Sequence, residues 1–450
     1  MRRLLRLTAI CFGMLVTVAA YAEEWSRFRG PNGSGRIAEA GSVPTVWNDT
    51  ENLKWKSPLP GPGASCPIVF GERIFVTCWT GYAVDRRDSG DLESLKRHLI
   101  CLDRASGKIL WNQSVAAALP EDRFQGMFAE NGYATHTPVC DGKRVVAFFG
   151  KSGVVAFDLE GNQLWTAQVG EDLDTRGWGS ASSPIIYQNL VIVTAAIENH
   201  ALVALDVATG KEVWKTEAEG LESTWGTPIL VDREDGKTDL VLSVPYEIWG
   251  LNPETGKLRW YCEAIESSSM CSSVVAADGV IYAVERGPRG GGAIAVRAGG
   301  KGDVTDTHVV WTTSDRSRVG TPVVAEGRIH WVSNKIATCV DAHTGERIYQ
   351  ERLAAGNSRV AEPASEAGGQ RGRRRGGRGG QDYASPIVAN GFLYYVTRNG
   401  QGFVVKLGEK FEQTATNAFG DGGEFSATPA ISNGALFLRS DKFLYCVSSE

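Results

Sequence analysis

The sequence predicts an all-β protein, an eight-bladed β-propeller of four-stranded antiparallel blades that is closed by an N-terminal strand. Three observations predict this fold. A turn motif that ends on a large aromatic recurs along the chain, a small residue followed by Pro opens each repeat, and the composition combines 53 Gly with little sign of long amphipathic helices. Repeats of about 45 residues with four strand signals each are typical of propeller blades.

The first motif joins two strands through a tight turn. In the copy from Ala204 to Trp214, Asp206 can accept backbone N–H groups and Gly210 can supply the positive φ of the turn. We expect the large aromatic of each outer strand to pack between neighbouring blades, in a structural role. These aromatics are Trp55, Trp111, Trp165, Trp214, Trp260, Trp311, Tyr349 and Phe411.

The second motif opens each repeat, where a small residue precedes Pro and an apolar strand. It occurs at Ser65-Cys66-Pro67, Thr137-Pro138, Ser183-Pro184, Thr227-Pro228, Thr321-Pro322, Ser385-Pro386 and Thr428-Pro429, and Ser272-Ser273 takes its place once. In the repeat that begins at Thr137, the four strand signals cover residues 137–140, 144–149, 153–157 and 163–167.

The last repeat lacks a fourth strand before Glu450, whereas residues 52–56 read as a fourth strand without the first three. Pairing these two parts would close the ring and cover two sheet edges that otherwise favour aggregation. We therefore expect residues 52–56 to complete the eighth blade.

Residues 1–22 are predicted to form a signal peptide. Arg2, Arg3 and Arg6 precede an apolar run over residues 7–20, and Ala20-Tyr21-Ala22 is typical of a cleavage site. The run is too short to span a bilayer comfortably and no second one follows, so we expect no transmembrane segment. The sequence thus predicts a periplasmic or secreted protein, cleaved after Ala22, in which residues 23–450 form one propeller.

Residues 356–381 are predicted to be a disordered loop between blades six and seven. The tract from 368 to 380 contains Gly, Arg and Gln alone, so it cannot bury enough apolar surface to offset its ordering entropy. The formal net charge is −5 at pH 7, and removal of the leader makes it more negative. This balance argues against general nucleic-acid binding.

The nine cysteines lack the spacing of a metal or redox motif. Cys101, Cys339 and Cys446 take a repeat position that holds small residues elsewhere, which indicates packing. Two disulfides are candidates, Cys66 with Cys78 and Cys262 with Cys271. The histidines show no ligand spacing, so we expect no metal site.

The long connections, over residues 79–98, 116–134, 171–181 and 354–382, all fall on one face of the predicted propeller. Loops held by a rigid scaffold often carry function. We expect the residues just before each small-Pro motif to line the funnel mouth on that face, where they either bind a polar ligand or partner peptide or fill the channel mouth. They are Asn131, Tyr133, His136, Trp178, Trp225, Met270, Arg318, Tyr383 and Glu424.

The repeated motif resembles the tryptophan-docking repeat of the pyrroloquinoline quinone (PQQ) propeller superfamily, which contains quinoprotein alcohol dehydrogenases and BamB-type outer-membrane assembly proteins. More narrowly, residues 25–33 (WSRFRGPNG), 177–184 (GWGSASSP) and 425–431 (FSATPAI) are similar to exported bacterial PQQ-like propellers of unassigned activity. The resemblance covers Trp25 to Ser448. It is specific for fold and weak for chemistry, because one fold hosts many functions.

The dehydrogenases of this superfamily carry two adjacent cysteines over the quinone and hold calcium with Glu, Asn and Asp beside a catalytic Asp. This sequence has no Cys-Cys pair and no such set at matching positions, and the acidic stretch Glu171, Asp172 and Asp174 fits a solvated loop. No catalytic residue is therefore assigned.

The resemblance and the missing residues together lead us to expect an exported, non-catalytic binding or scaffold propeller, BamB-like in role. Such a protein would engage an envelope protein or polymer partner on its long-loop face without a cofactor, and a monomer is compatible with this role. The alternative is a PQQ-dependent oxidoreductase, with calcium, that acts on an alcohol or sugar.

Overall fold

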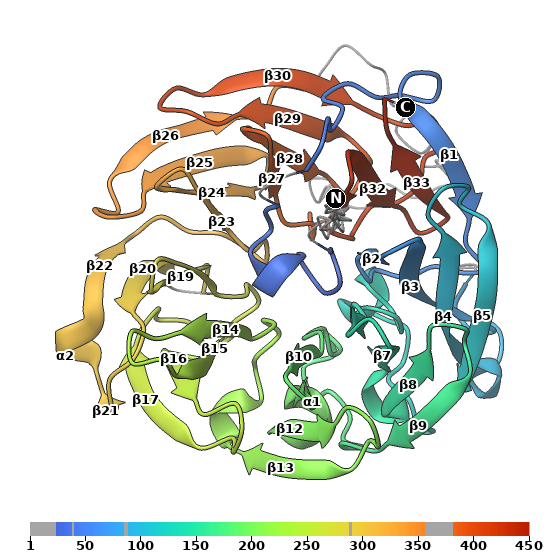
Figure 1. Cartoon of the computed structure of the whole chain (residues 1–450), viewed down its shortest axis with the longest axis horizontal. Coiled ribbons are helices and arrows are strands. Elements are labelled where there is room, and N and C mark those ends of the chain that lie inside the picture. The colour runs from blue at the N-terminus through green and yellow to red at the C-terminus, as the bar shows by residue number, and fades with distance from the viewer. Residues whose placement is uncertain (1–23, 38–39, 85–88, 288–289, 356–380, 450) are drawn as a thin grey trace, which may run out of the picture.

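Residues 24–37, 40–84, 89–287, 290–355 and 381–449 are described by the computed structural model. They form eight separate sheets that stand around a central axis (Figure 1). In each repeat the strands follow one another outward from the axis, and successive strands pair antiparallel. The predicted eight-bladed propeller is confirmed.

The first four blades are built as follows. Blade 1 contains β2 (Ile68–Phe70), β3 (Arg73–Thr80), β4 (Lys96–Asp103) and β5 (Ile109–Ala116); blade 2 contains β6 (Val139–Cys140), β7 (Arg144–Phe148), β8 (Val154–Asp158) and β9 (Gln163–Ala167); blade 3 contains β10 (Ile185–Tyr187), β11 (Leu190–Ala195), β12 (Ala201–Asp206) and β13 (Glu212–Glu217); blade 4 contains β14 (Ile229–Asp232), β15 (Thr238–Val244), β16 (Glu247–Leu251) and β17 (Leu258–Glu263), with the short β21 (Gly302–Asp303) added outside β17.

The other four blades complete the ring. Blade 5 contains β18 (Val275–Ala277), β19 (Val280–Glu285), β20 (Gly292–Arg297) and β22 (Val309–Thr313); blade 6 contains β23 (Val323–Ala325), β24 (Arg328–Ser333), β25 (Ile336–Asp341) and β26 (Arg347–Arg352); blade 7 contains β27 (Ile387–Ala389), β28 (Phe392–Val396), β29 (Gly402–Lys406) and β30 (Glu412–Asn417); blade 8 contains β31 (Ala430–Ser432), β32 (Ala435–Arg439), β33 (Phe443–Val447) and β1 (Leu53–Pro58).

Helical elements are short turns in the connections. They are η1 (Pro31–Gly33), η2 (Leu92–Ser94), η3 (Phe128–Glu130), η4 (Gly150–Ser152), α1 (Ala196–Asn199), η5 (Glu219–Leu221) and α2 (Thr305–His308). Within the described ranges, no helix has the length and apolar character needed to cross a bilayer.

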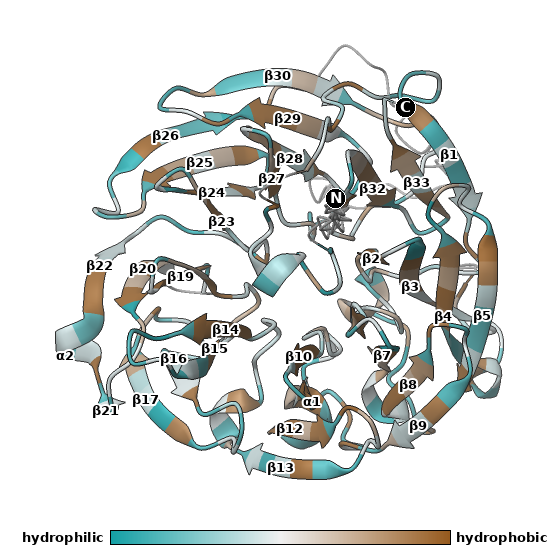
Figure 2. Cartoon of the chain, in the orientation of Figure 1, coloured by the Kyte–Doolittle hydropathy of each residue, from teal (hydrophilic) through white to brown (hydrophobic). Residues whose placement is uncertain are grey.

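Burial follows each strand's position in its blade. All positions of β11 are buried, because a middle strand is covered on both faces by neighbouring blades. The outermost strand β13 buries Trp214 and leaves most other positions exposed. Figure 2 shows the same contrast, with apolar colour along β4 and alternating colour along β13. The core therefore consists of separate apolar layers between blades.

The ring closes where the sequence predicts. Strand β1 pairs antiparallel with β33, with Trp55 opposite Cys446 and Lys56 opposite Tyr445. Figure 1 shows the blue β1 beside the red β33 at the rim of the ring. The last blade therefore combines strands from both ends of the chain, and β33 has a partner strand on each side, β32 and β1.

Most of the predicted aromatics lie between blades, and their indole N–H groups bond to the turn of the next blade. Glycine is required in the turn for two reasons, its backbone conformation and its lack of a side chain. Gly210 has a positive φ of 71°, and a Cβ at this position would lie 2.5 Å from the ring of Trp165. The indole bonds run from Trp55 to Arg104 O (3.0 Å), Trp111 to Leu159 O (3.0 Å), Trp165 to Val207 O (3.1 Å), Trp214 to Pro253 O (3.0 Å) and Trp311 to Ala342 O (3.0 Å).

Trp260 is a variation on this pattern. It is buried between blades 4 and 5, but its Nε1 donates to Asp239 Oδ2 in its own blade at 2.7 Å. Blade 5 replaces the tight Asp-to-Gly turn with a longer segment that holds β21 and α2. Trp260 therefore takes its acceptor from β15, which lies two strands away in its own sheet.

Phe411 does not take the position predicted for it. The register pairs Ala415 of β30 with Val404 of β29, which is the position that holds Trp214 opposite Ala204 in blade 3. Phe411 lies in the preceding turn and packs edge-on against Tyr349 of blade 6, with 5.7 Å between ring centroids. The layer between blades 7 and 8 is filled instead by residues 40–47, which include buried Ala40, Val43 and Trp47.

Residues 24–37, which we call the axial plug, enter the central channel from the face with the tight turns. Trp25 forms an isolated bridge with Val69 of β2, and Arg36 forms one with Val388 of β27. Figure 1 shows η1 of this segment at the centre of the ring. Residues 25–33 carry part of the family resemblance, but they lie outside the repeat, so no sequence pattern predicted their place in the channel.

Eight residues, one before each innermost strand, form a closed circle of hydrogen bonds that we call the hydroxyl ring. In each pair, the backbone N–H of one blade donates to the side chain of the equivalent residue in the next blade. The links are Cys66 to Thr137 (2.9 Å), Thr137 to Ser183 (3.0 Å), Ser183 to Thr227 (3.0 Å), Thr227 to Ser273 (2.9 Å), Ser273 to Thr321 (3.0 Å), Thr321 to Ser385 (3.0 Å), Ser385 to Thr428 (2.9 Å) and Thr428 to Cys66 Sγ (3.2 Å).

Both candidate disulfides are wrong, since all the cysteines in the described ranges are free. The register Ile68↔Phe75 offsets Cys66 from Cys78 by one position, and Cys66 Sγ accepts from Thr428 instead. Cys262 lies on β17, toward the outside of blade 4, whereas Cys271 lies at the channel, ahead of the innermost strand of blade 5. The predicted signal peptide and, apart from Gln381, the predicted loop 356–381 lie outside the described residues.

Replacing Trp55 by Ala should lower the free energy of unfolding by about 2–4 kcal/mol, because it removes a half-buried indole and its bond to Arg104 O. Chemical denaturation measures the effect. The matched control is Lys54→Ala on the same strand, which should change stability by less than about 0.5 kcal/mol. A Trp55→Ala protein as stable as the control would show that the ring closes without this contact.

Replacing Thr227 by Val should cost about 1–3 kcal/mol, because the shape is kept while the Ser183 N–H loses its acceptor. The matched control is Thr135→Val, whose hydroxyl has a long contact of 3.4 Å to Gly132 O. Thermal or urea unfolding of the two variants gives the comparison. Equal losses would contradict a stabilising role for the hydroxyl ring.

Candidate functional site

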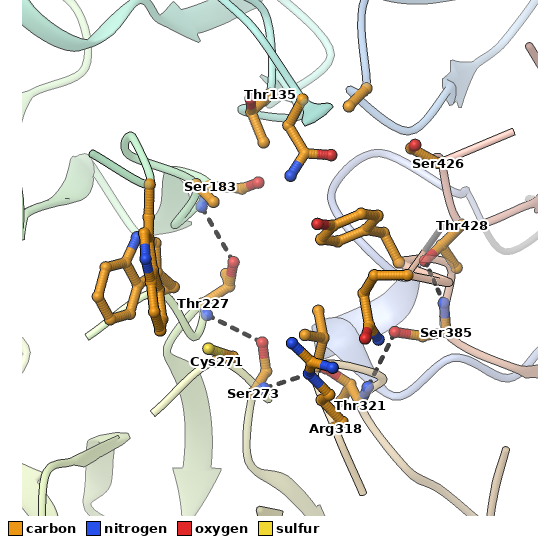
Figure 3. A pocket seen from close by; sticks show the side chains of 18 of the residues that line it. Thr135, Ser183, Thr227, Cys271, Ser273, Arg318, Thr321, Ser385, Ser426 and Thr428 are labelled. Atoms are coloured by element: carbon orange, nitrogen blue, oxygen red, sulfur yellow. Dashed lines mark hydrogen bonds between the residues drawn. The ribbon is translucent and has the colours of Figure 1, made fainter. Parts of the chain in front are cut away.

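A cavity of about 460 Å³, the funnel cavity, lies on the axis at the face with the long loops. The hydroxyl ring surrounds it, and Figure 3 shows bonds of the ring between Ser183, Thr227, Ser273, Thr321, Ser385 and Thr428. The axial plug contributes Phe28 to its lining. Cavities that hold small ligands have volumes of roughly 300–1,000 Å³, so this one is of ligand size.

Five of the predicted residues lie in the wall of the funnel cavity: Asn131, Trp178, Trp225, Arg318 and Tyr383. Trp178 and Trp225 pack against each other in a tilted arrangement, with 4.9 Å between ring centroids, and Trp225 Nε1 donates to Gly179 O at 2.6 Å. The sequence therefore placed these residues around one opening, as expected from their position before each innermost strand.

The other predicted residues lie outside this wall. Tyr133 is buried in an aromatic cluster with Trp79 and Phe128. His136 immediately precedes Thr137, so its side chain points away from the channel and is buried against Phe148. Met270 is buried between blades 4 and 5. Glu424 bonds to Arg398 at 2.9 Å, beside the mouth.

Some residues of the wall were missed. Phe28 belongs to the axial plug, which has no repeat pattern that would place it. The ring hydroxyls were read as markers of strand starts, although a small polar residue before each Pro was a visible signal. Cys271, Glu285 and Arg286 also line the cavity.

Trp178 is held in position by the loop that carries it. Asp174 accepts backbone N–H groups from Arg176 and Gly179, at 2.7 and 2.6 Å, and also from Trp178. This turn fixes the path of the chain just before Ser180. Asp174 is thus a structural residue of the loop that carries Trp178.

Residues 127–131, which we call the mouth strap, cross one side of the funnel. Glu130 comes from the connection between blades 1 and 2, yet its carboxylate accepts from Tyr383 Oη and from Arg398 Nη1 of blade 7. The same guanidinium also bonds to Glu424, and the Glu130–Arg398 pair is 2.8 Å long. The strap therefore narrows access to the cavity from this side and is fixed by an ion pair.

The positive groups of the cavity wall are exposed, whereas its carboxylate is buried. Arg318 and Arg286 are exposed there. Glu285 is buried, and its carboxylate accepts backbone N–H groups from Cys271 (2.7 Å), Ser272 (3.0 Å) and Arg286 (2.9 Å). Burial raises the pKa of the Glu285 carboxyl, and the three N–H donors oppose that rise. Its oxygens are therefore occupied by the protein itself.

A second cavity, of about 30 Å³, lies behind Ser180 and has room for about one water molecule. The ion pair Arg97–Glu121 (2.6 Å) lines it, together with the buried carboxylate of Glu198 on α1. Glu198 Oε2 has no hydrogen-bond partner among the described residues. Burial raises the pKa of the Glu198 carboxyl to about 7.

Ser180 and His136 make a contact that resembles a nucleophile with its base, since Ser180 Oγ lies 2.9 Å from His136 Nε2. However, burial, followed by the positive charge of Arg97, lowers the pKa of His136 to about 3. A base in acyl transfer must become protonated as the reaction proceeds. This histidine resists that step, so the pair is better suited to fixing the loop.

The residues do not fit PQQ held by a calcium ion and a cysteine ring. Among the described residues, no group of three His, Cys, Asp or Glu side chains is placed to hold a metal. The carboxylate of the wall, Glu285, is already bound by backbone N–H groups. The cysteines of the wall, Cys66 and Cys271, belong to blades 1 and 5 on different sides of the axis.

Glu198→Gln should stabilise the protein at pH 8 by about 3 kcal/mol and have little effect at pH 4.5. Because the folded pKa, about 7, lies above the ordinary value of 4.5, the stability linked to this group is fully present below pH 4.5 and is lost as pH rises through 7. Glutamine avoids that loss. Urea unfolding at both pH values measures it, with Glu171→Gln as the exposed control; a gain that does not depend on pH would contradict the assignment.

Comparison of the chain with known proteins supports the propeller fold. A family profile described as outer membrane protein assembly factor BamB matches residues 39–222 and 194–410. A search of the curated proteins found no significant match.

Several solved structures share the fold. BamB from Moraxella catarrhalis is 12% identical, with a TM-score of 0.56, over 88% of this chain and 97% of that one. A europium-containing methanol dehydrogenase is 11% identical, with a TM-score of 0.56, over 92% and 89%. The computationally designed Ika8 protein is 10% identical, with a TM-score of 0.50, over 86% and 98%. At these identities the likeness establishes the fold alone. Because the family profile spans most of the chain, this PQQ-like β-propeller belongs to the family described as outer membrane protein assembly factor BamB.

Proposed function

We propose that the protein is an exported binding propeller that holds a ligand, or part of a partner chain, in its funnel cavity and does not convert it chemically. One observation carries the proposal: a ligand-sized cavity is walled by aromatic, hydroxyl and guanidinium groups, while the carboxylates Glu285, Glu130 and Glu424 near it are engaged in structural bonds. Glu285 is bound by backbone N–H groups, and Glu130 and Glu424 by Arg398.

The wall has the composition of a recognition site. Trp178, Tyr383 and Phe28 supply apolar surface, and Asn131, Arg318 and the ring hydroxyls supply directional polar groups. Sites of this kind orient a ligand with a few polar groups against an apolar wall. The rigid ring of blades holds these groups in place before a ligand arrives, which lowers the entropy cost of binding.

Family membership and the predicted leader favour a place in the cell envelope, periplasmic or secreted. The partner we propose is an envelope protein or polymer with a segment small enough to enter the funnel. The mouth strap and the loop that carries Trp178 would then be the first parts to meet it, since both border the opening.

A cavity-filling variant tests this proposal. Ser426→Trp places a bulky ring in the cavity wall and should abolish capture of envelope components by the immobilised protein. The matched control is Ala105→Trp, an exposed residue in a tight turn of blade 1, which should capture as well as the unchanged protein. Capture is measured by mass spectrometry of material eluted from the three proteins.

Equal capture by both variants would show that the funnel is not the binding site. The oxidoreductase alternative gives a different result: after incubation with PQQ and calcium, the desalted protein would retain quinone absorbance and reduce a dye when an alcohol or sugar is added. That outcome would overturn the non-catalytic proposal.

A further inference from the structure

We propose that the funnel cavity takes an acidic group, a carboxylate or phosphate, of a small ligand or chain end. This inference deepens the proposed function and rests on the funnel being the binding site. It rests on the arginine side chains around the cavity, which form no ion pair with a carboxylate among the described residues.

Three arginines are buried around the hydroxyl ring: Arg27 and Arg29 of the axial plug and Arg439 of β32. Their hydrogen bonds go mainly to backbone carbonyls. Arg27 donates to Pro228 O (3.0 Å), Arg29 to Pro322 O (2.6 Å) and Pro386 O (2.9 Å), and Arg439 to Ser65 O (2.7 Å). Each of these carbonyls lies within one residue of a member of the hydroxyl ring, so the charges lie next to the cavity.

No carboxylate among the described residues forms an ion pair with any of the three. Burial lowers the pKa of Arg29 to about 9 and those of Arg27 and Arg439 to about 10. All three still carry their charge at neutral pH. A buried charge without a counter-charge is costly, so an anion nearby would be stabilised.

Two of these side chains also have unsatisfied donors. Arg27 Nε and Arg439 Nε have no hydrogen-bond partner among the described residues, and both side chains are buried. The guanidinium groups are therefore incompletely satisfied by the protein. They act on a ligand through space, as fixed positive charges in a medium of low dielectric constant.

The groups in the cavity wall that can contact a ligand directly also favour an anion. Each ring hydroxyl already accepts a backbone N–H, so its own hydrogen can be donated into the cavity. Arg318 is exposed in the wall, and within the described ranges its guanidinium has no ion pair. Arg286 adds a second exposed cation, whereas the carboxylate of Glu285 is occupied. Direct donors and fixed charges thus both favour an anion.

A pair of probes of equal shape tests the inference. Benzoate and benzamide have the same ring and differ in charge, and phenyl phosphate presents the other acidic group. Isothermal titration should give a dissociation constant for benzoate at least about 10-fold below that for benzamide, as expected when a charge-assisted hydrogen bond replaces a neutral one. Whichever of benzoate and phenyl phosphate binds with the lower dissociation constant identifies the preferred acidic group.

The variant is Arg318→Gln, which should remove most of the preference for benzoate over benzamide while both probes still bind. The matched control is Arg316→Gln, an exposed arginine two residues earlier that does not line the cavity. It should keep the preference. Added salt should weaken benzoate binding to the unchanged protein more than benzamide binding.

Equal affinity for the two probes, or equal loss in both variants, would overturn the inference and leave the funnel as a binding site of another preference. Failure of both probes to bind, with Ser426→Trp still abolishing capture, would also overturn it and leave the proposed function standing. Preference for benzoate without any funnel-dependent capture would support the anion site and remove the proposed partner role.

Discussion

The hydroxyl ring is the interaction on which the rest of the site depends. A propeller brings the first residue of every blade to a channel where no further strand can pair with it, so its backbone N–H needs another acceptor. The side chain of the equivalent residue in the next blade provides one. In seven blades the following residue is Pro, which has no N–H to satisfy. The repeated dipeptide of a small polar residue and Pro thus satisfies the backbone N–H groups at the channel and surrounds the channel with hydroxyl groups.

The same arrangement explains the charge of the axial plug. The prolines that precede the innermost strands still present carbonyl oxygens toward the channel, and these oxygens need donors. A guanidinium group offers five donors and no acceptor, so Arg27 and Arg29 suit a site walled by carbonyls. The channel is closed at one end by groups that satisfy the backbone, and positive charge accumulates below the cavity as a consequence.

The repeat made the fold predictable from sequence. Strand alternation, turn glycines and the unpaired strand at residues 52–56 each have a local signature, so blade number and ring closure followed. Phe411 was misplaced because a turn aromatic and an outer-strand aromatic look alike when the register is unknown. For the site, position before the innermost strand located Trp178 and Arg318, but not the direction of the His136 side chain. Phe28 and the Glu130–Arg398 pair join segments far apart in the chain, which no periodic pattern reveals.

Asymmetry of the funnel arises from segments outside the repeat. A ring of equivalent hydroxyls presents nearly the same surface from every blade and cannot by itself orient a ligand. The mouth strap narrows one side, Trp178 and Arg318 stand on loops of other blades, and Phe28 of the plug also lines the cavity. In Figure 3 the labelled Arg318 projects from the side of the cavity opposite Thr135. Selectivity must therefore reside in these few non-repeated groups, because they alone distinguish one orientation of a ligand from the next.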